Sequence, residues 1–171
     1  MNDKLDFIFS RRSVRLFTDD PVPKNLIDDI LMAGMSAPSA RAKDPWRFVV
    51  LREAEDLEAM LKIVPNGAML KSATAAFLVC GDIDTAHDNY ESYMLQDVSA
   101  CTENMLLAAN ALGLGSCWIG IHPRTERIKP LQHYFKLPDN IIPVAGIALG
   151  YPAQNPEKRT RYNKKFILNS E

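Results

Sequence analysis

The segment YESYMLQDVSACTENMLLAANAL, residues 90–112, decides the fold class of this chain. Its apolar residues recur at the three- and four-residue spacing of an α-helix. One stripe of them runs along a single side of that helix: Met94, Val98, Cys101, Met105, Ala109 and Leu112. Leu106 and Ala108 lie outside the stripe, so more than one side is apolar. Such a long helix is buried, either in the core of its own chain or against a partner chain, and the sequence leaves both alternatives open.

The residues around this helix show a mixed α/β pattern. Amphipathic spacing predicts shorter helices at residues 5–9, 23–35, 53–63 and 124–135. Short apolar runs typical of buried strands occur at residues 46–51, 75–80, 117–121 and 141–149. Pro23 is expected at the first position of its helix, and the segment Gly113-Leu114-Gly115 is expected to cap the long helix. These glycines do not form a dinucleotide-binding turn, because that turn follows a strand and begins a helix.

Composition favours a single globular domain over a nucleic-acid-binding or membrane-spanning protein. The chain has 171 residues, of which 47% are hydrophobic and 24% charged, with a net charge of −1. These values predict one globular domain spanning residues 1–171. No broad basic field is present, so nucleic acid is not expected as a partner, and no apolar run reaches the roughly 20 residues of a membrane helix.

The cysteines and the first residues predict a cytoplasmic protein. Three cysteines occur in apolar segments without metal-ligand spacing, at Cys80, Cys101 and Cys117. We therefore expect buried thiols and no metal site. Residues 1–10 are too polar for the apolar part of a signal peptide.

Residues 11–15, Arg-Arg-Ser-Val-Arg, concentrate hydrogen-bond donors for one small anion. A phosphate monoester carries roughly −1.5 to −2 charges and three strong acceptor oxygens at neutral pH. The planar guanidinium of arginine matches those oxygens, and the hydroxyl of Ser13 adds a donor. A solvated basic turn is the alternative. A second group of basic residues lies at residues 158–165.

Five short motifs, taken in order and with their spacing, resemble the FMN-dependent nitroreductase family. They are Arg11-Arg12-Ser13-x-Arg15-x-Phe17, Ala37-Pro38-Ser39-Ala40 with Pro45-Trp46-x-Phe48, Gln96-Asp97, Gly113-Leu114-Gly115-x-x-Trp118-Ile119-Gly120, and Gly150-Tyr151-Pro152. The resemblance covers nearly the whole chain, from about residue 5 to residue 165. It implies an α+β, nitroreductase-like fold with a mixed, mainly antiparallel sheet, flanking helices and a long central helix at a homodimer interface.

The resemblance also implies FMN as the cofactor and assigns residues to it. The residues that match the segment around the FMN phosphate and ribityl chain are Arg11, Arg12, Ser13 and Arg15. Arg159 and Arg161 are the best candidates for a further basic pair at the same phosphate, with Lys158 behind them, although a solvated tail is the alternative. The residues that match a loop reaching the flavin from the other subunit are Pro38, Ser39 and Ala40. The residues that match the strand end beside the isoalloxazine are Trp118, Ile119 and Gly120, where backbone N–H groups could bond the ring.

The implied activity is transfer of hydride from NAD(P)H through the flavin to nitro compounds, quinones or similar acceptors, by a ping-pong mechanism. The flavin carries the redox chemistry, so no catalytic acid or nucleophile of the protein is required. Two alternatives stay open: a non-catalytic flavin-binding sensor or storage protein, and a specialised member such as a dehalogenase or another flavin-dependent dehydrogenase. Similar sequences commonly read R-N-x-Q before Pro-Trp, whereas residues 41–44 here read Arg-Ala-Lys-Asp. This departure bears on the substrate pocket more than on the cofactor site.

Overall fold

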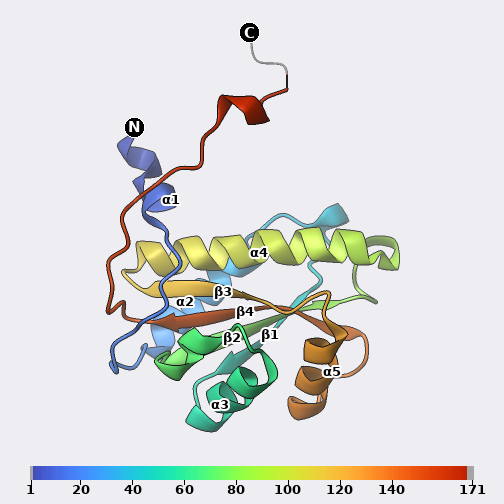
Figure 1. The fold of residues 1–171 in the computed structure, drawn as a ribbon. Helices are drawn as coiled ribbons and strands as arrows, with labels where there is room; N and C mark the ends of the chain where they lie inside the picture. The colour runs from blue at the N-terminus through green and yellow to red at the C-terminus, as the bar shows by residue number, and fades with distance from the viewer. Residues whose placement is uncertain (1, 169–171) are drawn as a thin grey trace.

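The computed structural model describes residues 2–168, in which four antiparallel strands form one sheet (Figure 1). The strands are β1 (Trp46–Leu51), β2 (Ala75–Asp82), β3 (Gly115–Gly120) and β4 (Ile141–Gly150), in the spatial order β1-β2-β4-β3. The two central strands, β2 and β4, are buried along nearly their whole length. This explains why they read as continuous apolar runs in the sequence rather than as alternating ones.

Helices cover both faces of the sheet. On one face lie α2 (Lys24–Met35) and α4 (Glu91–Ala111), and on the other lie α3 (Ala54–Ile63) and α5 (Thr125–Tyr134). The period of two along β2 separates these layers, because Phe77 joins the cluster under α2 and α4 while Leu78 joins the cluster under α3 and α5. The short helix α1 (Asp6–Ser10) lies against α4. The predicted α+β architecture is confirmed.

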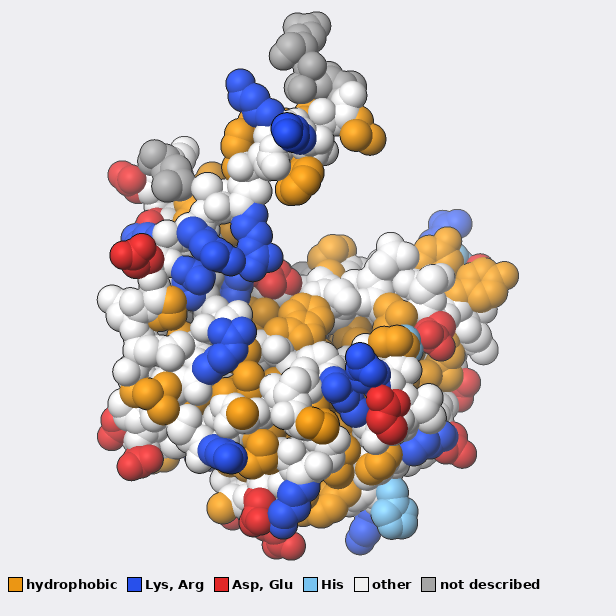
Figure 2. Space-filling view, viewed as in Figure 1, with side chains coloured by type: hydrophobic (Ala, Val, Ile, Leu, Met, Phe, Trp, Pro, Cys, Tyr) orange, Lys and Arg blue, Asp and Glu red, His pale blue; other side chains and the backbone are white. Residues whose placement is uncertain are grey.

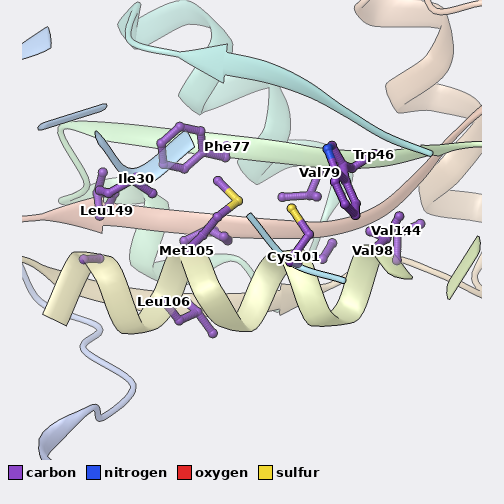
Figure 3. Packing of buried hydrophobic residues seen from close by; sticks show 14 of the residues in the cluster. Ile30, Trp46, Phe77, Val79, Val98, Cys101, Met105, Leu106, Val144 and Leu149 are labelled. Atoms are coloured by element: carbon purple, nitrogen blue, oxygen red, sulfur yellow. The ribbon is translucent and has the colours of Figure 1, made fainter. Parts of the chain in front are cut away.

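The apolar stripe of α4 packs into the core of its own chain. Met94, Val98, Cys101 and Met105 are fully buried against the sheet and α2, and Figure 3 shows Cys101 and Met105 pointing from the helix toward the strands. Of the two alternatives for this stripe, the structure shows burial in the core of its own chain. Leu107 differs, since it is only half-buried and stands outside the core cluster.

The N-terminal segment is attached to the outer edge of β3 by a parallel bridge. Ser13 pairs with Ser116, and the Val14 N–H donates to the Ser116 carbonyl at 2.9 Å. Gly115 permits this approach, because a Cβ there would lie 2.7 Å from Val14 Cγ1. Gly115 thus belongs to β3 rather than to the helix cap. Gly113, with φ +77°, ends α4 in the left-handed conformation that glycine tolerates.

Several element boundaries differ from the sequence-based expectation. Pro23 is the N-cap of α2 rather than its first helical residue, whereas α2 ends at Met35 as expected. β3 begins at Gly115, two residues earlier than expected. β2 continues past Cys80 to Asp82, because its last residues still pair with the start of β4. Shifts of one or two residues are usual at element ends, where backbone pairing rather than residue type sets the limit.

All three cysteines are buried, as the sequence predicts. Burial raises the pKa of the Cys80 and Cys101 thiols to about 12 in both cases. Burial also raises the pKa of Cys117, although the nearby Arg15 guanidinium and the Ser13 hydroxyl act in the opposite direction. The thiols therefore stay protonated at neutral pH. In residues 2–168, no helix has the length and apolar character needed to cross a membrane.

The contact between α2 and α4 at Gly34 generates a stability prediction. A Cβ at Gly34 would lie 2.6 Å from Met105 Cγ and 3.2 Å from Cys101 Sγ. Overpacking of this kind costs about 1–3 kcal/mol, whereas replacing a helical glycine with alanine gains about 1 kcal/mol. We expect Gly34→Ala to lower the free energy of unfolding, by up to about 2 kcal/mol, in urea titrations.

The control is the same substitution in a Met105→Ala background, where the clashing atom is gone. There Gly34→Ala should cost nothing further or should stabilise, as a double-mutant cycle would report. Higher stability of Gly34→Ala in the native background would contradict tight packing between α2 and α4.

Candidate functional site

Both groups of basic residues predicted from the sequence line one cavity of about 290 Å³. The cavity lies beside the C-terminal arm, which we define as residues 153–168, where the arm leaves the body of the protein. Figure 2 shows Lys and Arg side chains gathered there. Its walls are Ile8, Arg11, Arg12, Ser13, Arg15, Arg159 and Arg161. The first group follows the end of α1, and the second comes from the C-terminal arm running back past it (Figure 1). Two segments that are distant in sequence thus form one wall that can bind an anion. Arg12 and Glu157, which are in contact, are 145 residues apart.

Polar contacts hold the two segments together. An Arg12 guanidinium nitrogen donates to the Glu157 carbonyl. Lys158 Nζ lies 2.6 Å from both carboxylate oxygens of Asp6, so this lysine anchors the arm instead of lining the cavity. Arg11 Nε lies 3.4 Å from Glu103 Oε1 on α4.

The cavity keeps an excess of positive charge. Within residues 2–168, no carboxylate pairs with Arg15, Arg159 or Arg161. Three permanently charged guanidiniums therefore face one small space without a counterion from the described chain. Such an arrangement favours binding of a group with at least two negative charges.

The outer edge of β3 is open beyond the bridge to Ser13. The Ser116 carbonyl accepts from Val14, and the Gly120 carbonyl accepts from Arg127 Nη1 at 2.6 Å, so both carbonyls point away from β4. Because backbone groups alternate in direction along a strand, the N–H groups of Trp118 and Gly120 face this same edge. The strand therefore offers hydrogen-bond donors beside the cavity.

Side chains at this edge leave room for a flat ligand. Trp118 is 37% exposed. A Cβ added to Gly120 would meet no atom within 4 Å, so the backbone there can be approached closely. The side chain of Ile119 is buried in the core under α3 and α5. Ile119 therefore lies between Trp118 and Gly120 in the strand without facing the open edge.

The loop between α2 and β1 stands apart from this cavity. Its predicted site residues, Pro38, Ser39 and Ala40, do not line it. The loop is held by α4 instead, because the Ala40 N–H donates to Asp97 Oδ1 at 2.9 Å. Asp97 is a buried residue that the sequence motifs contained without a role. The structure of one chain therefore does not bring the loop and the basic cavity together.

The same loop has an unusual backbone. Arg41, Ala42 and Asp44 have φ values of 55°, 52° and 49°. The left-handed conformation costs a non-glycine residue roughly 1–2 kcal/mol and persists where the surroundings fix it. Here the Ser39 hydroxyl donates to Asp44 Oδ1 at 2.5 Å, and Arg47 donates to the Asp44 carbonyl at 3.2 Å. Strain of this kind clusters at functional sites, which marks the loop as a candidate binding element.

Sequence reasoning missed Arg127 at the end of β3, whereas the position of His122, two residues after Gly120, makes it a candidate to line the pocket, with an ordinary loop residue as the alternative. Arg127, on the first turn of α5, reaches the Gly120 carbonyl. His122 Nε2 lies 3.1 Å from Glu91 Oε1 at the start of α4. Neither contact has a local sequence signal, because each depends on how a helix packs beside the strand end. In the described part of the chain, no three His, Cys, Asp or Glu residues gather as metal ligands.

Comparisons with known proteins identify the family of this chain. The model of the Nitroreductase family matches residues 8–80 and 64–151. A protein of Methanothermobacter thermautotrophicus, whose name includes the words "NADH dehydrogenase/NAD(P)H nitroreductase", is 42% identical over 165 residues, covering 96% of this chain and 85% of that protein.

Two solved structures extend the likeness to three dimensions. One, from Bacteroides thetaiotaomicron and named in the same words, is 38% identical with a TM-score of 0.92, covering 100% of this chain and 99% of the other. Another, a nitroreductase from Desulfovibrio desulfuricans solved in complex with FMN, is 32% identical with a TM-score of 0.86, covering 100% and 98%. By family model, sequence identity and fold, this chain belongs to the nitroreductase family.

Proposed function

We propose that this chain is an FMN-dependent oxidoreductase that moves hydride from NAD(P)H to nitro compounds, quinones or similar acceptors. The observation that carries the proposal is the basic cavity built from both ends of the chain beside the open edge of β3. The FMN complex of the Desulfovibrio relative supports it. Residues 1–171 would then act as a single FMN-binding domain.

The cavity suits the phosphate of FMN. The phosphate brings roughly −1.5 to −2 charges, and the guanidiniums of Arg15, Arg159 and Arg161, which have no carboxylate partner within residues 2–168, supply the opposite charge. The Ser13 hydroxyl adds a neutral donor from the same wall. One such cavity accommodates one terminal phosphate, which favours FMN over a dinucleotide flavin.

The open edge of β3 suits the ring. The N–H groups of Trp118 and Gly120 can donate to acceptor atoms of a flat heterocycle, and Gly120 lets the ring approach the backbone. Bound FMN would supply the two-electron redox chemistry, while the chain binds and orients it. No acid or nucleophile of the chain is assigned a role in this scheme.

We further propose a homodimer in which the loop containing Pro38, Ser39 and Ala40 meets the cofactor of the partner chain. The loop is rigidly held yet does not line the cavity of its own chain. The C-terminal arm rises away from the body (Figure 1), with Phe166 76% exposed, as expected of a segment that packs on another molecule. Obligate interfaces of this kind bury roughly 2,000–5,000 Å².

The function is tested with purified protein reconstituted with excess FMN. We expect heat to release only FMN, NAD(P)H to bleach the flavin without oxygen, and an acceptor to restore its colour. Initial-rate plots should be parallel, because donor and acceptor use one pocket in turn. Flavin that binds but never bleaches would favour a sensor or storage protein. FAD alone, no flavin, or intersecting plots would each contradict a part of the proposal.

Arg15 provides a direct test of the anion cavity. Arg15→Ala removes an exposed guanidinium that has no carboxylate partner within residues 2–168, so FMN binding should weaken by about 1.5–3 kcal/mol, the scale of a hydrogen bond to a charged group. Thermal unfolding of the apoprotein should change little. Lys62→Ala is the matched control, because it removes one positive charge from α3 on the other face of the sheet. Equal FMN affinity in both variants would show that Arg15 belongs to a solvated turn.

Leu107 tests the homodimer. It lies on the outer side of α4, away from the core stripe, so Leu107→Asp should place a charge in the proposed interface. We expect light scattering to show monomers that have lost FMN. Val50→Asp makes the same change on exposed β1 and should stay dimeric. A native protein that is monomeric, fully loaded with FMN and active would contradict the shared site.

A further inference from the structure

We propose that Arg127 is a positioning residue at the open edge of β3, where it fixes Gly120 and places a permanent positive charge that makes bound FMN easier to reduce. The inference rests on the proposed FMN-dependent function. Arg127 lies outside the five sequence motifs. It is on α5, the helix that packs beside α3 on the face of the sheet away from α2 and α4.

The contact that carries the inference is short and direct. Arg127 Nη1 donates to the Gly120 carbonyl at 2.6 Å, in a partly buried position. The turn between β3 and α5 returns the chain over the strand end, because the Arg124 N–H donates to the Ile121 carbonyl at 3.1 Å and the Arg127 N–H donates to the Arg124 carbonyl at 2.9 Å. The guanidinium is therefore held at the edge by the fold of the turn as well as by its own bond.

Most of the donor groups of Arg127 have no acceptor among residues 2–168. A guanidinium has five N–H donors, and the bond to Gly120 uses one of them. Among residues 2–168, no carboxylate forms an ion pair with Arg127, and the neighbouring Glu126 instead lies 3.5 Å from Arg124. A backbone hydrogen bond, followed by the charges of Arg124 and Arg127, lowers the pKa of Glu126, so this carboxylate lies within electrostatic reach of Arg127. Within residues 2–168, however, the charge at the strand end has no direct ion-pair partner.

The carbonyl that Arg127 holds belongs to the residue with the most accessible backbone on this edge. Gly120 has no side chain, and the space where a Cβ would stand is empty to 4 Å. The N–H and C=O groups of one strand residue point in the same direction. By fixing the carbonyl of Gly120, Arg127 also fixes the direction of its N–H group, which is a proposed donor to the ring.

The charge matters because reduction changes the charge of the ring. Hydride transfer oxidises NAD(P)H to NAD(P)+ and gives the flavin two electrons and one proton, so the reduced ring carries one more negative charge than the oxidised ring. A fixed positive charge in a partly buried site stabilises the product of this change more than the starting state. Arg127 should therefore tighten binding of reduced FMN more than binding of oxidised FMN.

The test compares holoprotein variants by flavin affinity and midpoint potential. Arg127→Gln and Arg127→Ala both remove the charge, and the comparison can be made with whichever of the two variants folds. We expect reduced FMN to lose at least tenfold more affinity than oxidised FMN, which lowers the two-electron potential by at least about 30 mV. Arg127→Lys keeps the charge and should lose less. Arg124→Gln is the matched control, because it removes a charge that is 58% exposed and paired with Glu126, and its potential should not move.

Several outcomes would overturn the inference. Equal weakening of oxidised and reduced FMN would mean that Arg127 only supports the fold of the strand end. An unchanged potential with a raised KM for NAD(P)H would place Arg127 at the donor instead. A potential shift of the same size in Arg124→Gln would show a general charge effect. If the native protein fails to bind FMN, it is the proposed function that fails, before any variant is compared.

Discussion

The backbone hydrogen bond from Val14 to the Ser116 carbonyl is the constraint on which the whole site depends. It attaches the arginine segment to the outer edge of β3 and occupies the first part of that edge. Beyond this point no strand of the described chain pairs with the edge, so the backbone of Trp118 and Gly120 stays available to a ligand. The absence of a side chain at Gly115 makes the contact possible. One bridge therefore creates the cavity wall and also leaves the strand open beside it.

Helix α4 organises the parts around this bridge. Its apolar stripe closes the core, while polar residues on its other sides hold the segments of the site. Glu103 pairs with Arg11, Asn110 Nδ2 donates to the Phe7 carbonyl at 2.8 Å, and Asp97 accepts from Ala40 at the loop. The helix thus supports the basic cavity near its C-terminal half and the strained loop near its N-terminal half. Any rearrangement of α4 would disturb both.

The charged residues near the termini divide into two groups by their partners. Lys158 is neutralised by Asp6, and exposed pairs of this kind contribute at most about 1 kcal/mol, so they mainly set the path of the arm. Arg15, Arg159 and Arg161 lie near one another, and no carboxylate of the described residues pairs with them, so their mutual repulsion costs electrostatic energy in the free protein. A bound anion removes that repulsion, so ligand binding and folding of the arm are thermodynamically linked.

Elements with local signals are predictable from the sequence. A short, largely apolar run predicts β1 at Trp46–Leu51, helical spacing predicts α4 to within one residue at each end, and the density of arginines at residues 11–15 indicates an anion site. Folding in three dimensions was needed to show that the α4 stripe faces its own sheet, that the arm lines the cavity, and that Arg127 reaches Gly120. These facts depend on contacts between segments distant in sequence or across a turn, where geometry rather than residue pattern selects the partner.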